Sequence, residues 1–257
     1  MTTFPPLIIV AFIFGACIGS FLNVCIYRIP AGASIVRPAS RCPQCRTTIA
    51  AYDNVPILSW LLLAGKCRRC GAPIPIRYPF VELLGGLAAI ACVLMFGPTL
   101  HALALFAFIA TLVVVTFIDL DHRIIPDVIS LPGIPIFFAA AFLVPTVTWK
   151  ASALGILVGG GSLYAVAWGY QALTGREGMG GGDIKLLAMI GAMVGWQGIL
   201  FTLFAASAIG TIVGLLAMVG SGKGMRLAIP FGPFLAMGAI LYLFFGNGLI
   251  AWYLNLL

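Results

Sequence analysis

The stretch that decides the fold is residues 100–127, which read LHALALFAFIATLVVVTFIDLDHRIIPD. Residues 100–118 hold no Asp, Glu, Lys or Arg, and three aspartates then follow by position 127. An α-helix needs about 20 mainly apolar residues to cross the roughly 30 Å hydrocarbon core of a bilayer. The stretch therefore predicts a membrane-spanning helix that ends in carboxylates at an interface.

The whole chain has the composition of a membrane protein. Of its 257 residues, 62% are hydrophobic and 8% are charged, against roughly 25% charged in an ordinary soluble domain. Disorder is excluded because it requires low hydrophobicity and high charge. The sequence predicts an all-α polytopic membrane protein of about eight transmembrane helices, at 5–27, 79–98, 100–118, 128–147, 152–173, 184–196, 198–219 and 229–255.

The basic residues predict the topology and the domains. Eight of the fourteen Lys and Arg residues lie in residues 28–78, and this segment accounts for the whole net charge of +7. If it is cytoplasmic and the spans alternate, every basic residue except Lys150 falls on the cytoplasmic side, as the positive-inside rule requires. We expect a first transmembrane helix (1–27), a cytoplasmic loop domain (28–78) and a transmembrane core (79–257), with both termini outside.

Four cysteines in the loop predict a metal site. Cys42 and Cys45 form one C-x-x-C pair, Cys67 and Cys70 form another, and 21 residues separate the pairs. This spacing is close to that of a zinc ribbon. Two disulfides are the alternative, but a cytoplasmic loop lies in a reducing compartment. Because four thiolates close the coordination shell, the expected Zn²⁺ is structural.

Two carboxylates at the expected membrane edge are candidate catalytic groups, because charged groups at membrane depth are costly. Asp119 ends the third apolar run, and Asp183 follows a glycine run and begins the sixth. Asp119 would lie at the C-terminal end of one helix and Asp183 at the N-terminal end of another, where the helix dipoles act on a carboxylate in opposite directions. Two carboxylates in such different environments suit acid and base roles around one water. Gly180 and Gly182 would let an extended substrate approach closely. The alternative is that Asp183 only caps a helix.

The remaining polar residues of this region have plainer interpretations. Asp127 follows a proline and is expected to be the N-cap of the fourth span, with catalysis as the alternative. Asp121 and His122 are expected in a solvated turn. The glycines at 155, 159, 160 and 161 lie inside an apolar run and predict a helix-packing face.

Taken together, these residues resemble the bacterial type IV prepilin peptidases, which are GxGD-type membrane aspartic proteases. The resemblance covers nearly the whole chain. Its motifs are Gly19 to Val24 with Tyr27 to Pro30, the paired C-x-x-C knuckles, Asn54 to Trp60, Gly65 to Arg68, Arg77 to Glu82, Asp119 to Asp127 and Gly180 to Leu186.

The resemblance implies an activity and a location. The catalytic aspartates of the family fall on Asp119 and Asp183. They would cleave the short basic leader of a prepilin or pseudopilin at the cytoplasmic face of the bacterial inner membrane. The resemblance also implies N-methylation of the new terminus with S-adenosylmethionine, although no glycine-rich nucleotide loop follows a predicted strand. Since the cysteine loop is basic, a basic leader is expected to be guided by acids, namely Asp119, Asp121, Glu177 or Asp183.

Two other classes of function remain open at this point. An ion-coupled membrane transporter with a structural zinc loop would also have interfacial acids and glycine-broken helices, but no inverted repeat is visible. A membrane-tethered zinc module could bind a partner or nucleic acid through the basic loop. The loop has little of the aromatic interleaving that base stacking uses, and the expected partners are therefore prepilins and the lipid bilayer, not nucleic acid.

Overall fold

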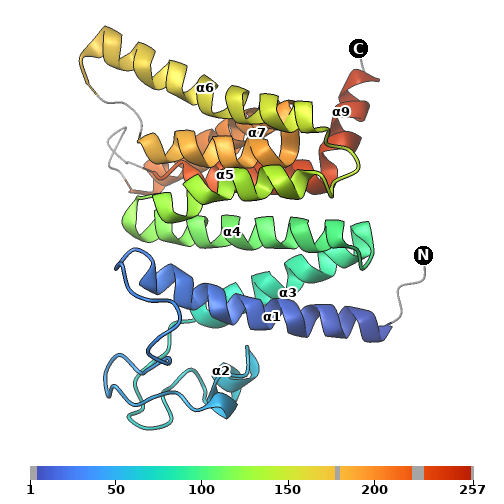
Figure 1. The fold of residues 1–257 in the computed structure, drawn as a ribbon. Helices are drawn as coiled ribbons and strands as arrows, with labels where there is room; N and C mark the ends of the chain where they lie inside the picture. Colours follow the sequence, from blue (N-terminus) through green and yellow to red (C-terminus); the bar gives the residue numbers. More distant parts are fainter. Residues whose placement is uncertain (1–4, 177–179, 222–228, 256–257) are drawn as a thin grey trace. The chain divides into compact units, whose positions relative to one another are not determined.

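The computed structural model describes residues 5–176, 180–221 and 229–255. All of the long elements are helices (Figure 1). The chain divides into two compact units, Met1–Val114 (unit 1) and Val115–Leu257 (unit 2). The helix α4 (Leu100–His122) runs across this division. The all-α prediction is confirmed.

Unit 1 is built around two helices that lie side by side (Figure 1), α1 (Pro5–Arg28) and α3 (Arg77–Phe96). Glycines allow their backbones to touch. A Cβ on Gly19 would lie 2.7 Å from the Cα of Glu82, and a Cβ on Gly85 would lie 3.1 Å from the Cα of Gly19. This is the small-residue contact that lets membrane helices pack without a hydrophobic driving force.

The loop between α1 and α3 holds only the short helices η1 (Ala51–Asp53) and α2 (Leu58–Leu62) and two isolated β-bridges. The first turn of α3, which follows the loop, is held to α1, because Asn23 Nδ2 donates to the Tyr78 carbonyl at 3.0 Å. The middle of the loop is fastened to α3, because the backbone N–H of Ile57 donates to Glu82 Oε2 at 2.7 Å. The buried Glu82 thereby holds the loop at the start of α3.

Unit 2 contains the end of α4 and the helices α5 (Asp127–Ala141), α6 (Trp149–Thr174), α7 (Gly181–Ser221) and α8 (Gly232–Leu241), followed by the π-helix η3 (Tyr242–Gly246) and α9 (Asn247–Leu254). α7 packs against α5, α6 and α8. Residues 186–195 of α7 are all buried, so this part of α7 forms the centre of unit 2.

The contact between α6 and α7 confirms most of the predicted glycine face. A Cβ on Gly155 would collide with the Gly191 carbonyl, and one on Gly159 would lie 2.5 Å from the Leu187 carbonyl oxygen. Gly160 lies against α7 more loosely. Gly161 has no described atom within 4 Å of the position of a Cβ, so it is not part of the contact. The close approach fixes α6 against the buried part of α7.

Five described helices are long and apolar enough to cross a membrane: α1, α3, α4, α6 and α7. The expected count of eight is therefore not confirmed. α5 ends at Ala141 and has 15 residues, fewer than the expected run 128–147, and Gly232–Gly246 is likewise short. The expected spans 184–196 and 198–219 both fall within α7, which is broken at Gly195, where φ is 73° and ψ is 176°.

Two local predictions near the acidic segment were wrong. Asp121 and His122 belong to the last turn of α4, because this helix continues beyond the apolar run. Asp127 is the first residue of α5, not its N-cap. Pro126 holds the N-cap position, where it makes no side-chain hydrogen bond. A carboxylate in the first turn still interacts favourably with the helix dipole.

Candidate active site and metal centre

A cavity of about 240 Å³ in unit 2 brings the predicted site residues together. It is lined by residues from the end of α4, the α4–α5 connection and the start of α7: Asp119, Arg123, Ile124, Ile125, Asp127, Gly180, Gly182 and Asp183. Both candidate catalytic aspartates and both candidate substrate-binding glycines are in this set. The two aspartates meet because α5, which follows α4, packs against α7.

Asp119 lies one turn before the end of α4 and is 5% exposed. Its Oδ2 accepts a hydrogen bond from the backbone N–H of Gly232, at 3.1 Å. Its carbonyl accepts from the backbone N–H of Arg123 at 2.9 Å, and Arg123 has a φ of 56°. This left-handed residue ends α4. Backbone N–H groups therefore bind both the side-chain carboxylate and the main-chain carbonyl of Asp119.

Asp183 lies in the first turn of α7. Its Oδ1 is buried, and no hydrogen-bond partner for it lies among the described parts of the chain. A buried carboxylate oxygen without a donor is unusual, because most buried polar atoms are paired. This oxygen is therefore available to a water molecule or a substrate in the cavity.

The two candidate substrate-binding glycines before Asp183, Gly180 and Gly182, differ in their surroundings. A Cβ on Gly182 would lie 2.9 Å from the Cβ of Ile125, so this glycine is required by the packing of α7 against the α4–α5 connection. Gly180 has no described atom within 4 Å of the position of a Cβ. Of the two, only Gly180 leaves open space beside the cavity.

An ion pair joins the starts of α5 and α7 beside the cavity. Lys185 Nζ lies 2.7 and 2.8 Å from the two carboxylate oxygens of Asp127. The two side chains are 36% and 56% exposed, so the pair contributes little stability by itself. It does explain why Asp127 is better placed to hold α7 than to act on a substrate. Glu177, which we considered as a guide for the leader, lies outside the described residues.

Gly232 is a site residue that the sequence analysis missed. It begins α8 within the stretch Pro230-Phe231-Gly232-Pro233-Phe234. Proline and glycine alternating with aromatic residues inside an apolar run is a signal for a break in a helix. That signal could have marked the position, but it could not have indicated the contact with Asp119.

The four loop cysteines form a cluster in unit 1. Their Sγ atoms all lie within 4.8 Å of one another, and Cys42 Sγ and Cys70 Sγ are 3.8 Å apart. With Zn–S bonds of about 2.3 Å, a tetrahedral site would place its sulfur atoms about 3.8 Å apart. The donor set and its spacing therefore fit a four-coordinate metal, and the predicted metal ligands are brought together.

The two knuckles are built alike. In the first, the backbone N–H of Arg46 donates to the Cys42 carbonyl, and in the second that of Gly71 donates to the Cys67 carbonyl, both at 2.9 Å. Arg46 and Gly71 each follow the second cysteine of their pair, and both have a left-handed backbone, with φ of 56° and 70°. Each turn points its two thiols to the same side.

The surroundings of two of the four cysteines favour thiolates, the form that binds metals. At Cys70 a backbone hydrogen bond from Ala72 is outweighed by burial and by the neighbouring cysteine side chains, which raise the pKa of this thiol to about 11. Hydrogen bonds from the side chain and backbone of Thr47 lower the pKa of the Cys45 thiol to about 6. Backbone hydrogen bonds from Cys70 and Arg69 lower the pKa of the Cys67 thiol. Both knuckles therefore contribute to the readiness of the cluster to take a cation.

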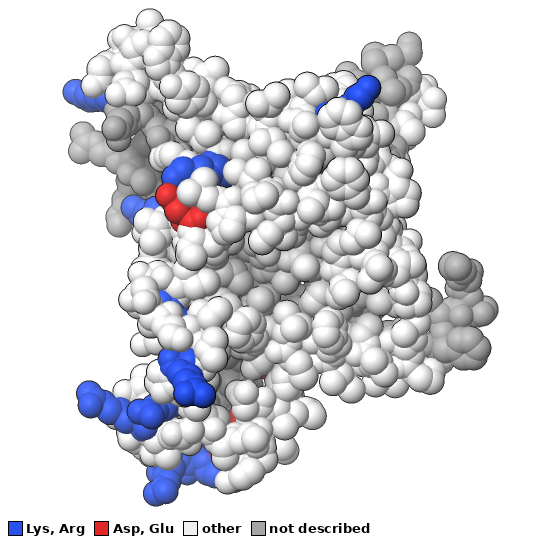
Figure 2. Space-filling model, in the orientation of Figure 1, with Lys and Arg blue, Asp and Glu red and all other residues white. Residues whose placement is uncertain are grey.

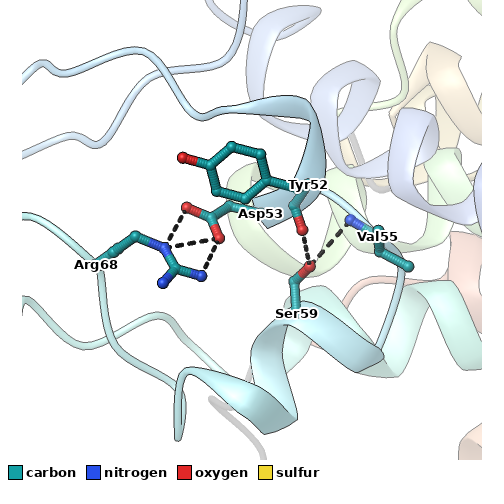
Figure 3. Close-up of polar contacts among 5 residues, drawn as sticks. All are labelled: Tyr52, Asp53, Val55, Ser59 and Arg68. Atoms are coloured by element: carbon teal, nitrogen blue, oxygen red, sulfur yellow. Dashed lines mark hydrogen bonds and ion pairs between the residues drawn. The ribbon is translucent and has the colours of Figure 1, made fainter.

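An ion pair links the second knuckle to η1 (Figure 3). The Arg68 guanidinium contacts both oxygens of Asp53, with Nε at 2.9 and 3.0 Å and a terminal nitrogen at 2.6 Å. It also lies over the Tyr52 ring, 5.6 Å from its centroid. The neighbouring Ser59 hydroxyl donates to the Tyr52 carbonyl at 3.1 Å, so η1 is fixed to α2 as well.

The stability contributed by Asp53 should depend on pH. Hydrogen bonds from Arg68 lower the pKa of this carboxyl, so its contribution is present above the unfolded pKa and is lost as the pH falls through the folded pKa. We expect Asp53→Asn to lower the thermal unfolding midpoint slightly at neutral pH, and the difference from the wild type to disappear in acid. Arg69→Gln, which removes a neighbouring exposed charge, is the control. A difference that grows in acid would contradict this assignment.

The rest of the loop surface is basic. Lys and Arg side chains gather over the segment between α1 and α3 (Figure 2), as the count of eight in residues 28–78 requires. Arg28, at the end of α1, donates to the carbonyls of Ser34 and Pro38 at 2.9 and 2.7 Å. This arginine therefore serves to fold the start of the loop.

Comparisons with known proteins show which family the chain is similar to. Residues 13–96 match the bacterial peptidase A24 N-terminal domain, and residues 106–215 match the type IV leader peptidase family. The chain is 42% identical over 221 residues to a prepilin leader peptidase/N-methyltransferase of Myxococcus xanthus, covering 86% of this chain and 66% of that protein. It is 36% identical to the protein of the same name from Aeromonas hydrophila, covering 95% and 92% of the two chains. No solved structure matches.

The fold and these similarities define a multi-pass helical membrane protein of a bacterial peptidase class. The chain belongs to the type IV leader peptidase family. The resemblance inferred from the sequence motifs is thereby confirmed. The N-terminal match ends within α3, and the second match includes both the end of α4 and the start of α7, where the two aspartates lie.

Proposed function

We propose that this protein is a prepilin leader peptidase and N-methyltransferase, and that Asp119 and Asp183 form its proteolytic dyad. The observation on which this rests is that the two aspartates line one cavity, together with Gly180 and Gly182 of the same predicted motif. Membership of the family favours this function over an ion-coupled transporter or a nucleic-acid-binding zinc module. The substrates are prepilins or pseudopilins.

The proposed reaction is hydrolysis of one peptide bond by a water held between the carboxylates. One carboxylate takes a proton from the water, and the resulting hydroxide forms a C–O bond with the scissile carbonyl. The other carboxylic acid gives its proton to the amine as the C–N bond breaks. Gly180 leaves room for the extended leader at the cavity, because a Cβ there would meet no described atom.

The cysteine cluster is proposed to hold a structural Zn²⁺. Four thiolates leave no coordination position for water, so the ion would stabilise the loop without taking part in hydrolysis. Zinc binding would contribute much of the free energy that folds the loop, because a segment of this size buries too little apolar surface to fold by itself.

The protein is proposed to lie in the bacterial inner membrane, with the loop and the cavity on the cytoplasmic side. The eight crossings would be α1, α3, α4, α5, α6, the two parts of α7 on either side of Gly195, and the C-terminal segment that begins with α8. This arrangement is supported by the basic residues of 28–78, which would all be cytoplasmic. Among the described residues outside the loop, Arg123, Arg176 and Lys185 would also be cytoplasmic, and Lys150 alone would lie on the other side. The loop would belong to a domain of its own, 28–78, ahead of a protease core, 79–257.

The methyl group of the second reaction would come from S-adenosylmethionine, which supplies an electrophilic methyl for transfer to the new terminal amine. Support for this half of the function is the name of the relatives, which are peptidases and N-methyltransferases. The two activities would act in sequence, since the amine exists only after the leader has been removed.

The test is to incubate the purified full chain with a prepilin in detergent or vesicles and to follow the substrate by mass spectrometry. We expect loss of the leader without S-adenosylmethionine, and loss of the leader with the gain of one methyl group when it is present. The same prepilin with the residue before its scissile bond replaced by a bulky residue is the control. An intact substrate in both conditions would contradict the proposed function.

A further inference from the structure

A third chain segment reaches the aspartate pair. Gly232 is the first residue of α8, and its N–H donates to Asp119 Oδ2 at 3.1 Å. The first N–H groups of a helix have no partner within the helix, and they favour negative charge in front of them. The N-terminal end of α8 thus supplies a hydrogen-bond donor to Asp119, whereas Asp183 Oδ1 has no donor in the described structure.

There is no room for a side chain at position 232. A Cβ there would lie 2.6 Å from Asp119 Oδ2, 3.3 Å from Asp119 Cγ and 3.3 Å from Ile125 Cδ1. A contact below 3.0 Å cannot persist, so any side chain would displace the carboxylate or α8. Only glycine allows the N–H to approach the carboxylate from this direction.

We propose that Gly232 is a positioning residue that sets the orientation of the Asp119 carboxylate in the cavity. This inference rests on the proposed function, because it assigns the role of Gly232 through Asp119. The N–H holds Oδ2 and thereby fixes the orientation of the whole carboxylate at the cavity. It also stabilises negative charge on Asp119.

The test compares Gly232→Ala with Gly161→Ala. Gly161 lies in α6 with no described atom within 4 Å of a Cβ, so it reports the effect of adding a methyl group to a helix of unit 2. We expect Gly232→Ala to lower kcat for leader cleavage by about ten- to a hundredfold, since a misplacement of about 1 Å can cost about 10²-fold. KM should change much less, and Gly161→Ala should leave both constants near those of the wild type.

A second variant separates displacement of Asp119 from crowding against Ile125. If the defect arises from the contact with Ile125 Cδ1, adding Ile125→Val to Gly232→Ala removes that atom and should restore kcat relative to Ile125→Val alone. We expect no such rescue. Rescue by Ile125→Val, or a loss confined to KM, would overturn the proposal.

A stability measurement covers the case in which Gly232→Ala is too unstable for reliable kinetics. The contact predicts that Gly232→Ala lowers the thermal midpoint in the wild-type background but not in an Asp119→Ala background, where the carboxylate is absent. Equal losses in both backgrounds would overturn the proposal. The proposed function fails separately: if Asp119→Asn retains cleavage, Asp119 is not catalytic, whatever the behaviour of Gly232.

Discussion

Replacing either Asp119 or Asp183 by asparagine will leave the prepilin leader uncleaved. Asparagine matches aspartate in size but cannot supply the acid or base of the dyad, and the loss of such a group typically costs about 10²–10⁴-fold in rate. Because each carboxylate needs the other, we expect the double variant to be no slower than the slower single variant.

Folding should survive these substitutions. The asparagine oxygen at position 119 can still accept from the Gly232 N–H, and Asp183 Oδ1 loses no described hydrogen bond. The measurements are cleavage by mass spectrometry, thermal unfolding and bound zinc for each variant. Asp53→Asn removes the same charge in the loop and should still cleave. Cleavage that persists in both Asp119→Asn and Asp183→Asn would exclude the dyad.

Removal of one loop thiolate will unfold the metal centre. We expect Cys42→Ser or Cys67→Ser to lower bound zinc from one ion per chain to nearly none, because a serine hydroxyl is a poor zinc ligand at neutral pH. Zinc binding to small structural sites of this kind contributes about 10–16 kcal/mol at neutral pH, so its loss should unfold the loop.

The effect on the two activities should be unequal. Both proposed catalytic aspartates lie in unit 2, whereas the cysteines lie in unit 1. We therefore expect leader cleavage to be partly retained, and we predict a larger loss of methylation. Cys17→Ser, which changes an exposed cysteine outside the cluster, is the control. Equal loss of both activities would indicate that the loop supports folding of the whole protein, and undiminished zinc would contradict the proposed ligands.

The chemistry of the candidate site could be predicted from the sequence because it depends on rare residues. Carboxylates are costly next to apolar runs, and paired C-x-x-C motifs have few functions. Asp119, Asp183 and the four cysteines were therefore conspicuous. How the two aspartates come together could not be predicted, because it depends on α5 packing against α7, a tertiary contact between apolar surfaces that resemble one another.

Other features could not be predicted because backbone geometry decides them. The role of Gly232 rests on an N–H group, which every residue except proline has, so no side chain marks it. Asp127 was placed one position too early relative to its helix, since both Pro126 and Asp127 are acceptable at a helix start. The apolar runs identified membrane helices but not their ends, as the end of α5 at Ala141 and the break at Gly195 show.

The two parts of α7 on either side of the break at Gly195 differ in their burial. Residues 186–195 are buried in protein, whereas the part after the break presents side chains such as Leu200, Phe204 and Leu216 at the surface. Lipid acyl chains therefore have far more contact with the later part than with residues 186–195. A change in bilayer thickness would tilt or strain that part, as hydrophobic mismatch does, while the depth of Asp183 is set by the helices around it. The protein would then keep the same cleavage site in membranes of different thickness.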